Sequence, residues 1–139
     1  MLLPKKVKFR KWQTGRKSDE KLNRPETRGI DVAFGSYGLK ATSGNRVKSN
    51  QIEAARKVIS RTAGKTGRLW IRIFPDRPFT AKPAEVGMGK GKGDAQGYCF
   101  EVRPGRILFE IDGVTEDVAR EAMRKAGSKL PVNTKFVSR

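Results

Sequence analysis

The chain has 139 residues, the size of a single domain, and its 31 Lys and Arg against 14 Asp and Glu give a formal net charge of +17. It contains no histidine, so the commonest general base and metal ligand is absent, and most hydrolytic and zinc-dependent mechanisms are excluded. The single cysteine, Cys99, can form no internal disulfide, and its apolar neighbours predict a buried hydrophobe. We therefore expect a protein that is not an enzyme and holds neither a metal nor a cofactor.

The excess of positive charge predicts a polyanionic partner. Like charges on a compact domain repel one another unless a polyanion neutralises them, and nucleic acid is the obvious polyanion. No apolar run is long enough to span a membrane, so we expect no membrane partner. We also expect no homo-oligomer.

Residues 1 to 29 are predicted to form an extended basic arm. The stretch has few apolar residues and cannot bury enough surface to offset the entropy of ordering it. Two aromatic rings, Phe9 and Trp12, lie among its cations and could either stack on an unpaired base or dock on the domain, and the sequence leaves both open. The cations are Lys5, Lys6, Lys8, Arg10, Lys11, Arg16, Lys17, Lys21, Arg24 and Arg28.

The remainder, residues 30–139, is predicted to be a single α+β domain. It begins with alternating apolar residues at 30–34, which predict a strand. A helix is expected from Ser49 or Asn50 to about Ala63, with Asn50 and Glu53 spaced as a capping-box variant. The apolar face of this helix would comprise Ile52, Ala55, Ile59 and Ala63. The helix cations that lie largely away from that face are Arg56, Lys57 and Arg61.

The second half of the domain is predicted to complete one sheet. A strand at 69–74 is followed by a long irregular loop, 75–96, where prolines and glycines prevent regular hydrogen bonding. Residues 98–102 and 107–111 are expected to pair as a hairpin, and a helix should run from Thr115 to a stop at Gly127. A last strand at 135–137 would close the sheet, so the expected architecture is a mixed sheet with two packed helices.

Glycine and lysine alternate in the loop from Met88 to Gly93. A backbone without Cβ atoms can lie against a sugar-phosphate chain, and in an extended run Lys90 and Lys92 would project to the same side. A nucleotide-binding P-loop is the rival interpretation, and it needs a glycine five residues before its Gly-Lys pair. The three positions concerned hold Ala84, Val86 and Ile59 instead. The pattern therefore favours a loop that meets the phosphates of a nucleic acid, with a flexible basic linker as the alternative.

Seven segments occur in the order seen in a known family, and together they span nearly the whole chain. They are Met1 to Lys5, Lys8 to Lys11, Phe34 to Leu39, Gln51 to Arg56, Trp70 to Asp76, Met88 to Gly93, and Lys129 to Pro131. In these segments the chain resembles the bacterial-type large-subunit ribosomal protein numbered sixteen. The resemblance implies an α/β-hammerhead-like fold that docks on large-subunit ribosomal RNA near the central protuberance, beside other large-subunit proteins. It places the protein in a bacterial or organellar ribosome.

The resemblance also implies roles for particular residues. The tRNA-facing loop, which would reach the A-site tRNA and in one alternative the P-site tRNA, comprises Met88, Gly89, Lys90, Gly91, Lys92 and Gly93. The residues expected to bind ribosomal RNA are Lys5, Lys6, Lys8, Arg10, Lys11, Arg16, Arg56, Lys57 and Arg61.

Two departures from the family pattern limit how far these residue roles can be carried over to this chain. Family members often have arginine immediately before the Met-Gly-Lys run, and an oxygenase hydroxylates it in some bacteria, but this chain has Gly87 there. The segment 17–28 is longer than expected of the family by roughly half a dozen residues, and loops usually tolerate insertions of this kind.

Two other classes of function stay open on the sequence. One is a stand-alone RNA- or DNA-binding protein, because charge alone does not separate it from a ribosomal component. The other is a phosphoryl-transfer enzyme, which is disfavoured because no Gly-Lys pair has the preceding glycine that a P-loop needs.

Overall fold

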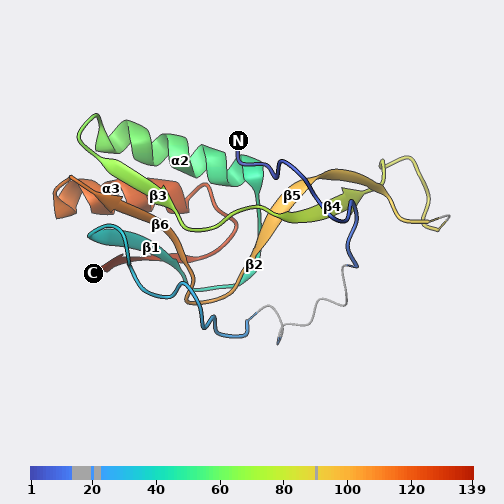
Figure 1. The fold of residues 1–139 in the computed structure, drawn as a ribbon, viewed down its shortest axis with the longest axis horizontal. Helices are drawn as coiled ribbons and strands as arrows, with labels where there is room; N and C mark the ends of the chain where they lie inside the picture. The colour runs from blue at the N-terminus through green and yellow to red at the C-terminus, as the bar shows by residue number, and fades with distance from the viewer. Residues whose placement is uncertain (14–19, 21–22, 90) are drawn as a thin grey trace.

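Two helices and seven strands form an α+β domain in the computed structural model, which describes residues 1–13, 20, 23–89 and 91–139. The elements are β1 (Tyr37–Ala41), β2 (Asn45–Lys48), α2 (Ser49–Ala63), β3 (Arg68–Ile71), β4 (Arg77–Ala81), β5 (Asp94–Val102), β6 (Ile107–Asp112), α3 (Glu116–Gly127) and β7 (Thr134–Ser138). The predicted α+β class is confirmed. The strands, however, form two antiparallel sheets and not one, with orders β3-β6-β1-β7 and β2-β5-β4 (Figure 1).

Both predicted helices and the final strand are present. Helix α2 buries Ile52, Ala55 and Ile59 on one face, and α3 buries its alanines and Met123. The two helices pack against each other, and both contact the four-stranded sheet, α2 through β3 and α3 through β1 and β7. Strand β7 lies at the edge of that sheet beside β1. The predicted periodicities therefore mark the core correctly, and Cys99 is buried as expected.

The capping residues of α2 differ from the prediction. The helix begins at Ser49 with Lys48 as its N-cap, and the backbone N–H of Lys48 donates to Gln51 Oε1 at 2.9 Å. Glu53 does not cap the helix; it accepts hydrogen bonds from the guanidinium of Arg56. The side chain of the third helical residue does accept the N–H of the N-cap, as in a capping box. The pair is Gln51 and Lys48, two residues earlier than the predicted Glu53 and Asn50.

The strand predicted at 30–34 is wrong. The backbone N–H groups of Ala33, Phe34 and Gly35 all donate to Glu110 Oε1, at 2.8, 2.8 and 3.1 Å. The first strand of the sheet is β1, which starts at Tyr37. Alternating apolar residues indicated a strand, but a buried carboxylate on β6 takes the hydrogen bonds that a neighbouring strand would have received.

The predicted hairpin of 98–102 and 107–111 is also wrong, although both strands exist. Strand β5 pairs with β2 and β4 in the small sheet, whereas β6 pairs with β1 and β3 in the large one. The turn at Pro104 and Gly105 carries the chain from one sheet to the other, and Gly105 has a positive φ of 100°. Its N–H donates to the carbonyl of Ala41 at 2.7 Å, so the turn is anchored to β1.

The predicted loop 75–96 contains strand β4 and the start of β5, so its irregular parts are 75–76 and 82–93. Strand β4 includes Pro78, which has no N–H to donate to a sheet. The strand is nevertheless possible because β4 lies at an edge of the small sheet, with β5 on one side alone. Strand β3 is shorter than predicted and ends at Ile71.

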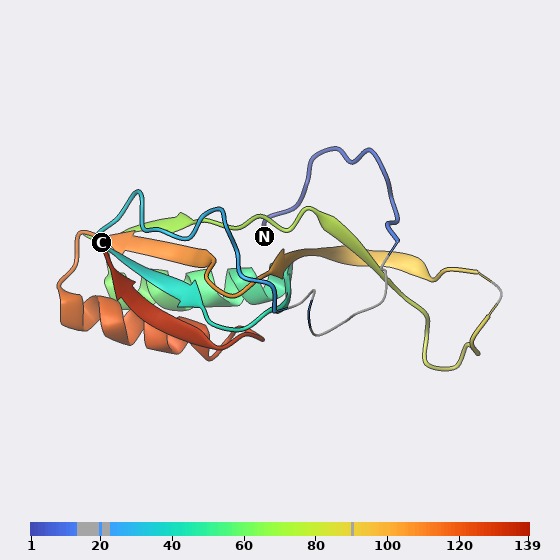
Figure 2. The ribbon, with the colours of Figure 1, turned by 90° about the horizontal axis from the view of Figure 1, so that it is seen from below.

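Residues 1–13 contain no helix or strand and run along the outside of the domain (Figures 1 and 2). Leu2 packs against the hydrophobic core, while Lys5 to Gln13 are exposed. The first residues of the chain are thus attached to the body through Leu2, and the extended arm over 1–29 stays a prediction. Arg16, Lys17 and Lys21 lie outside the described residues.

Candidate nucleic-acid interface

The glycine and lysine loop lies at the tip of the β4–β5 hairpin, which projects from one end of the molecule (Figures 1 and 2). Gly89 and Gly91 both have φ of +98°, and a Cβ at either position would meet nothing within 4 Å. Glycine is therefore favoured there by backbone conformation and not by a lack of space. Met88 is 98% exposed. This part of the loop presents backbone that a partner could approach closely.

Gly93 has a different role from the other loop glycines. A Cβ at this position would lie 2.6 Å from the carbonyl oxygen of Ala81 and 3.0 Å from the nitrogen of Lys82. Those atoms belong to the opposite side of the hairpin, so Gly93 allows the two sides to close. The sequence pattern assigned all three glycines to phosphate approach, whereas Gly93 is required by the fold itself.

The described lysines of the loop make contacts within the chain. The Nζ of Lys92 donates to the carbonyl of Trp12, and the Nζ of Lys82 donates to the carbonyl of Gly89. Lys82 was not among the predicted site residues, although its position between Ala81 and Pro83 at the loop entry could have marked it. Lys90 lies outside the described residues, so the expected common side of Lys90 and Lys92 stays a prediction.

Trp12 joins the arm to the small sheet. The guanidinium of Arg77, on β4, lies 5.7 Å from the centre of the Trp12 ring, and its NH2 group donates to the carbonyl of Gln13 at 3.1 Å. The same guanidinium lies 2.6 Å from Glu101 on β5. Of the two outcomes that the sequence left open for Trp12, the structure shows docking on the domain.

The arm is therefore fastened at two points, Leu2 on the core and Trp12 on the hairpin. Its intervening cations are all exposed, and residues 1–13 include no acidic residue. They are Lys5, Lys6, Lys8, Arg10 and Lys11. A basic strip thus leads from the body toward the loop. Arg16, also predicted to bind ribosomal RNA, lies outside the described residues.

The predicted cations of α2 do not form one set. Arg56 is engaged by Glu53 through two hydrogen bonds of 3.0 and 2.6 Å, and this pairing lowers the pKa of Glu53. Lys57 and Arg61 are exposed. Arg61 borders a hollow of about 260 Å³ between α2 and α3, together with Lys125 and Lys129. These last two lysines were not predicted as site residues.

Two features are absent from the described part of the chain. It contains no group of three or more acidic, cysteine or histidine side chains that could hold a metal ion. None of its helices combines the length and the apolar character needed to cross a membrane. At Gly87, where the resemblance to the family led to an expected arginine, a Cβ would meet nothing within 4 Å, so the structure has room for a side chain there.

Comparison with known proteins gives a match over nearly the whole chain. The family model for ribosomal protein L16p/L10e matches residues 4–137. The large ribosomal subunit protein uL16 of Halorhodospira halophila is 53% identical over 139 residues, covering 100% of this chain and 98% of the relative. Those of Chelativorans sp. and Polaromonas naphthalenivorans are 52% and 53% identical and are covered over 98% and 97% of their lengths. The chain therefore belongs to the ribosomal protein L16p/L10e family and is a structural constituent of the large ribosomal subunit.

Proposed function

We propose that this protein binds large-subunit ribosomal RNA through its basic arm and body, and contacts A-site tRNA through the loop from Met88 to Gly93. The observation that carries the proposal is that the chain presents two basic regions in different settings. One is the arm strip of exposed cations fastened across the body, and the other is the glycine loop at the tip of a projecting hairpin. The first is suited to anchoring, and the second reaches beyond the domain.

Phosphate contact is the chemistry that both regions favour. Lysine and arginine side chains position a protein on a nucleic-acid backbone, and backbone N–H groups of glycines can donate to phosphate oxygens as well. The full-length match to large-subunit relatives favours this role over a stand-alone RNA- or DNA-binding protein. The same match argues against a phosphoryl-transfer enzyme, since the family role is structural.

The test compares a loop variant with an arm variant in assembled subunits. Replacing Lys90 and Lys92 with alanine should leave occupancy of the protein in subunits unchanged and lower A-site tRNA affinity modestly, by roughly twofold to tenfold, because individual exposed phosphate contacts are weak. Replacing Lys5, Lys6 and Lys8 should lower occupancy without a specific tRNA defect. The measurement is A-site tRNA affinity per particle that retains the protein.

Because Lys92 also binds the Trp12 carbonyl, Lys90→Ala alone is the cleaner loop variant. If Lys90→Ala reduced occupancy while particles retaining the protein bound tRNA normally, the loop would be an assembly element, and its assignment to tRNA would be withdrawn.

A further inference from the structure

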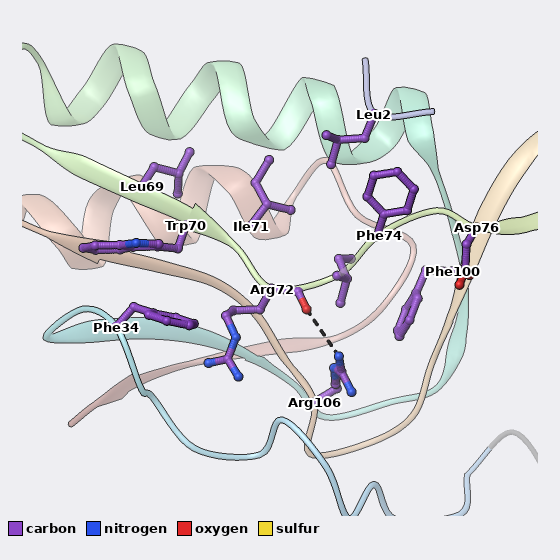
Figure 3. A pocket seen from close by; sticks show the side chains of 11 residues that line it. Leu2, Phe34, Leu69, Trp70, Ile71, Arg72, Phe74, Asp76, Phe100 and Arg106 are labelled. Atoms are coloured by element: carbon purple, nitrogen blue, oxygen red, sulfur yellow. Dashed lines mark hydrogen bonds between the residues drawn. The ribbon is translucent and has the colours of Figure 1, made fainter. Parts of the chain in front are cut away.

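Hollows on the described surface differ in whether their cations have partners within the chain. A groove of about 660 Å³ beside β3 is lined mainly by apolar and aromatic side chains (Figure 3). The guanidinium of Arg72 there forms an ion pair with the buried Glu110. The guanidinium of Arg106 lies 4.0 Å from Glu26 and donates to the carbonyl of Arg72 at 3.3 Å. Both cations of this groove are therefore engaged already.

The hollow of about 260 Å³ between α2 and α3 has a different composition. Six described residues line it, of which none is acidic and only Val58 is apolar. Three of the six are cations that come from the last turn of α2 and from the end of α3, namely Arg61, Lys125 and Lys129. The hollow thus gathers like charges that an anion would neutralise.

These three cations have little acidic compensation. Among the residues that the structure describes, no carboxylate pairs with Arg61 or Lys129. The Nζ of Lys125 lies 3.7 Å from Glu121 Oε1, but Arg124 approaches the same oxygen more closely, at 2.7 Å. The partial negative charge at a helix C-terminus, about half an elementary charge, offsets only part of the surplus. The hollow therefore keeps most of its positive charge.

The backbone that carries these cations is fixed by the fold. Helices α2 and α3 pack against each other, and after α3 the backbone N–H of Lys129 donates to the carbonyl of Ala126 at 3.0 Å. The next residue, Leu130, belongs to the hydrophobic core. The hydroxyls of Thr62 and Ser128 donate to carbonyls of the preceding turn at 3.0 and 2.6 Å. The side-chain donors left for a ligand in the hollow are thus those of the three cations.

This set of donors suits a phosphate better than an acidic peptide. Three cationic side chains can each donate to a different phosphate oxygen, and a volume of about 260 Å³ is ample for one phosphate group. A peptide would also need apolar surface to pack on, and Val58, the one apolar residue among the described lining, is half-buried. The described lining includes no aromatic ring on which a base could stack.

We propose that the hollow between α2 and α3 binds a backbone phosphate of RNA through Arg61, Lys125 and Lys129. The proposal rests on the proposed function for the nature of the anion, and it assigns the body an anchoring site of its own. This site shares no residue with the arm or with the loop. Because it contacts phosphate and no base, it should hold RNA of any sequence.

The test uses the full chain with the three lysines of residues 5–8 replaced by glutamine, so that the arm contributes little to binding. The probe is a short oligouridylate, which should shift the backbone amide NMR signals of residues 58–62 and 125–129 together. Adding Lys125→Gln and Lys129→Gln should remove the shifts at 58–62. It should also lower the affinity by roughly twofold to tenfold, because exposed phosphate contacts are individually weak. The slope of the logarithm of affinity against that of salt concentration should fall by about 1.4.

Lys65→Gln with Lys135→Gln, in the same arm background, is the matched control. Both lysines are exposed, neither lines the hollow, and neither is paired with a carboxylate of the described residues. This variant loses the same charge and should keep the shifts and nearly the full affinity. Thermal unfolding checks that both variants are folded. An equal loss of affinity in the control would mean that RNA responds to net charge alone, and the site would be overturned.

Two further outcomes separate this proposal from the proposed function. If the original chain bound oligouridylate but the signals at 58–62 and 125–129 did not move, the site would be overturned while RNA binding stood. Failure of the original chain to bind oligouridylate would contradict the proposed function itself. An oligoaspartate of equal charge is the second probe. If it shifted these signals at lower concentration than oligouridylate, the hollow would take an acidic protein segment, and the proposal would fail.

Discussion

Glu110 is a fully buried carboxylate on β6 that fixes the segment before β1. It forms an ion pair with Arg72 and accepts the N–H groups of Ala33, Phe34 and Gly35. Burial by itself would raise the pKa of Glu110, but the Arg72 hydrogen bond and the three backbone N–H groups outweigh it and lower the pKa below its ordinary value. Glu110 therefore fixes the segment that carries Phe34, a link that no local pattern in the sequence shows.

Replacing Glu110 with glutamine should lower the free energy of unfolding by about 3 to 5 kcal/mol, because it leaves a partly buried guanidinium without its partner. The lowered pKa means that the carboxylate stabilises the fold above about pH 4.3 and that this stabilisation is lost as the pH falls through the lower folded pKa. The variant should lack this part of the acid dependence. Urea unfolding at neutral and acidic pH measures both effects.

Glu116→Gln is the control for that comparison. Glu116 pairs with Arg120 at 2.9 Å, but both side chains are more than half exposed. Its loss should therefore cost less than about 1 kcal/mol. Equal destabilisation by the two substitutions would show that the buried network does not hold the segment 33–35.

At the scale of elements, local patterns predicted the helices and failed on the pairing of strands. The 3.6-residue spacing of Ile52, Ala55 and Ile59 decides the buried face of α2 without reference to the rest of the chain. Strand partners depend on residues far away, and the short turn at Gly105 looks the same whether its strands pair or enter two sheets. Pro78 likewise indicated a loop, because the sequence does not show that β4 has a free edge.

The attachment of the arm gives a prediction about its mobility. We expect residues 1 to 29 to be cleaved by trypsin faster than the helices in the free protein, and to be protected in assembled subunits, since RNA would neutralise the cations. Trp12→Ala should increase cleavage of the free arm by roughly twofold to fivefold, because the cation–π contact with Arg77 is lost. Phe9→Ala, at a more exposed ring, should change the rate little. A free arm as resistant as the helices would contradict this view.

At the scale of the whole molecule, the surplus charge is unevenly distributed. Two acidic residues of α3 are paired with basic neighbours, Glu116 with Arg120 and Glu121 with Arg124. The arm cations at 5–11 have no acidic residue within residues 1–13. The sequence predicted the basic arm and the glycine loop as separate features. It could not show that Lys92 and Arg77 both meet the arm near Trp12, because these contacts join residues more than sixty positions apart.

This uneven distribution predicts how RNA affinity depends on salt. Each cation that neutralises a phosphate releases a counterion, so the logarithm of affinity for a single-stranded RNA falls with the logarithm of salt concentration by about 0.7 per contact. Replacing Lys5 and Lys6 with glutamine should reduce the slope by about 1.4 if both bind phosphate. Replacing Arg120 and Arg124 with glutamine removes the same charge from α3, where both guanidinium groups are paired with glutamates. That variant should keep nearly the full slope. Filter-binding titrations across a salt series measure both slopes. Equal loss in the two variants would mean that RNA responds to the net charge of the whole protein and that the arm is not its anchor.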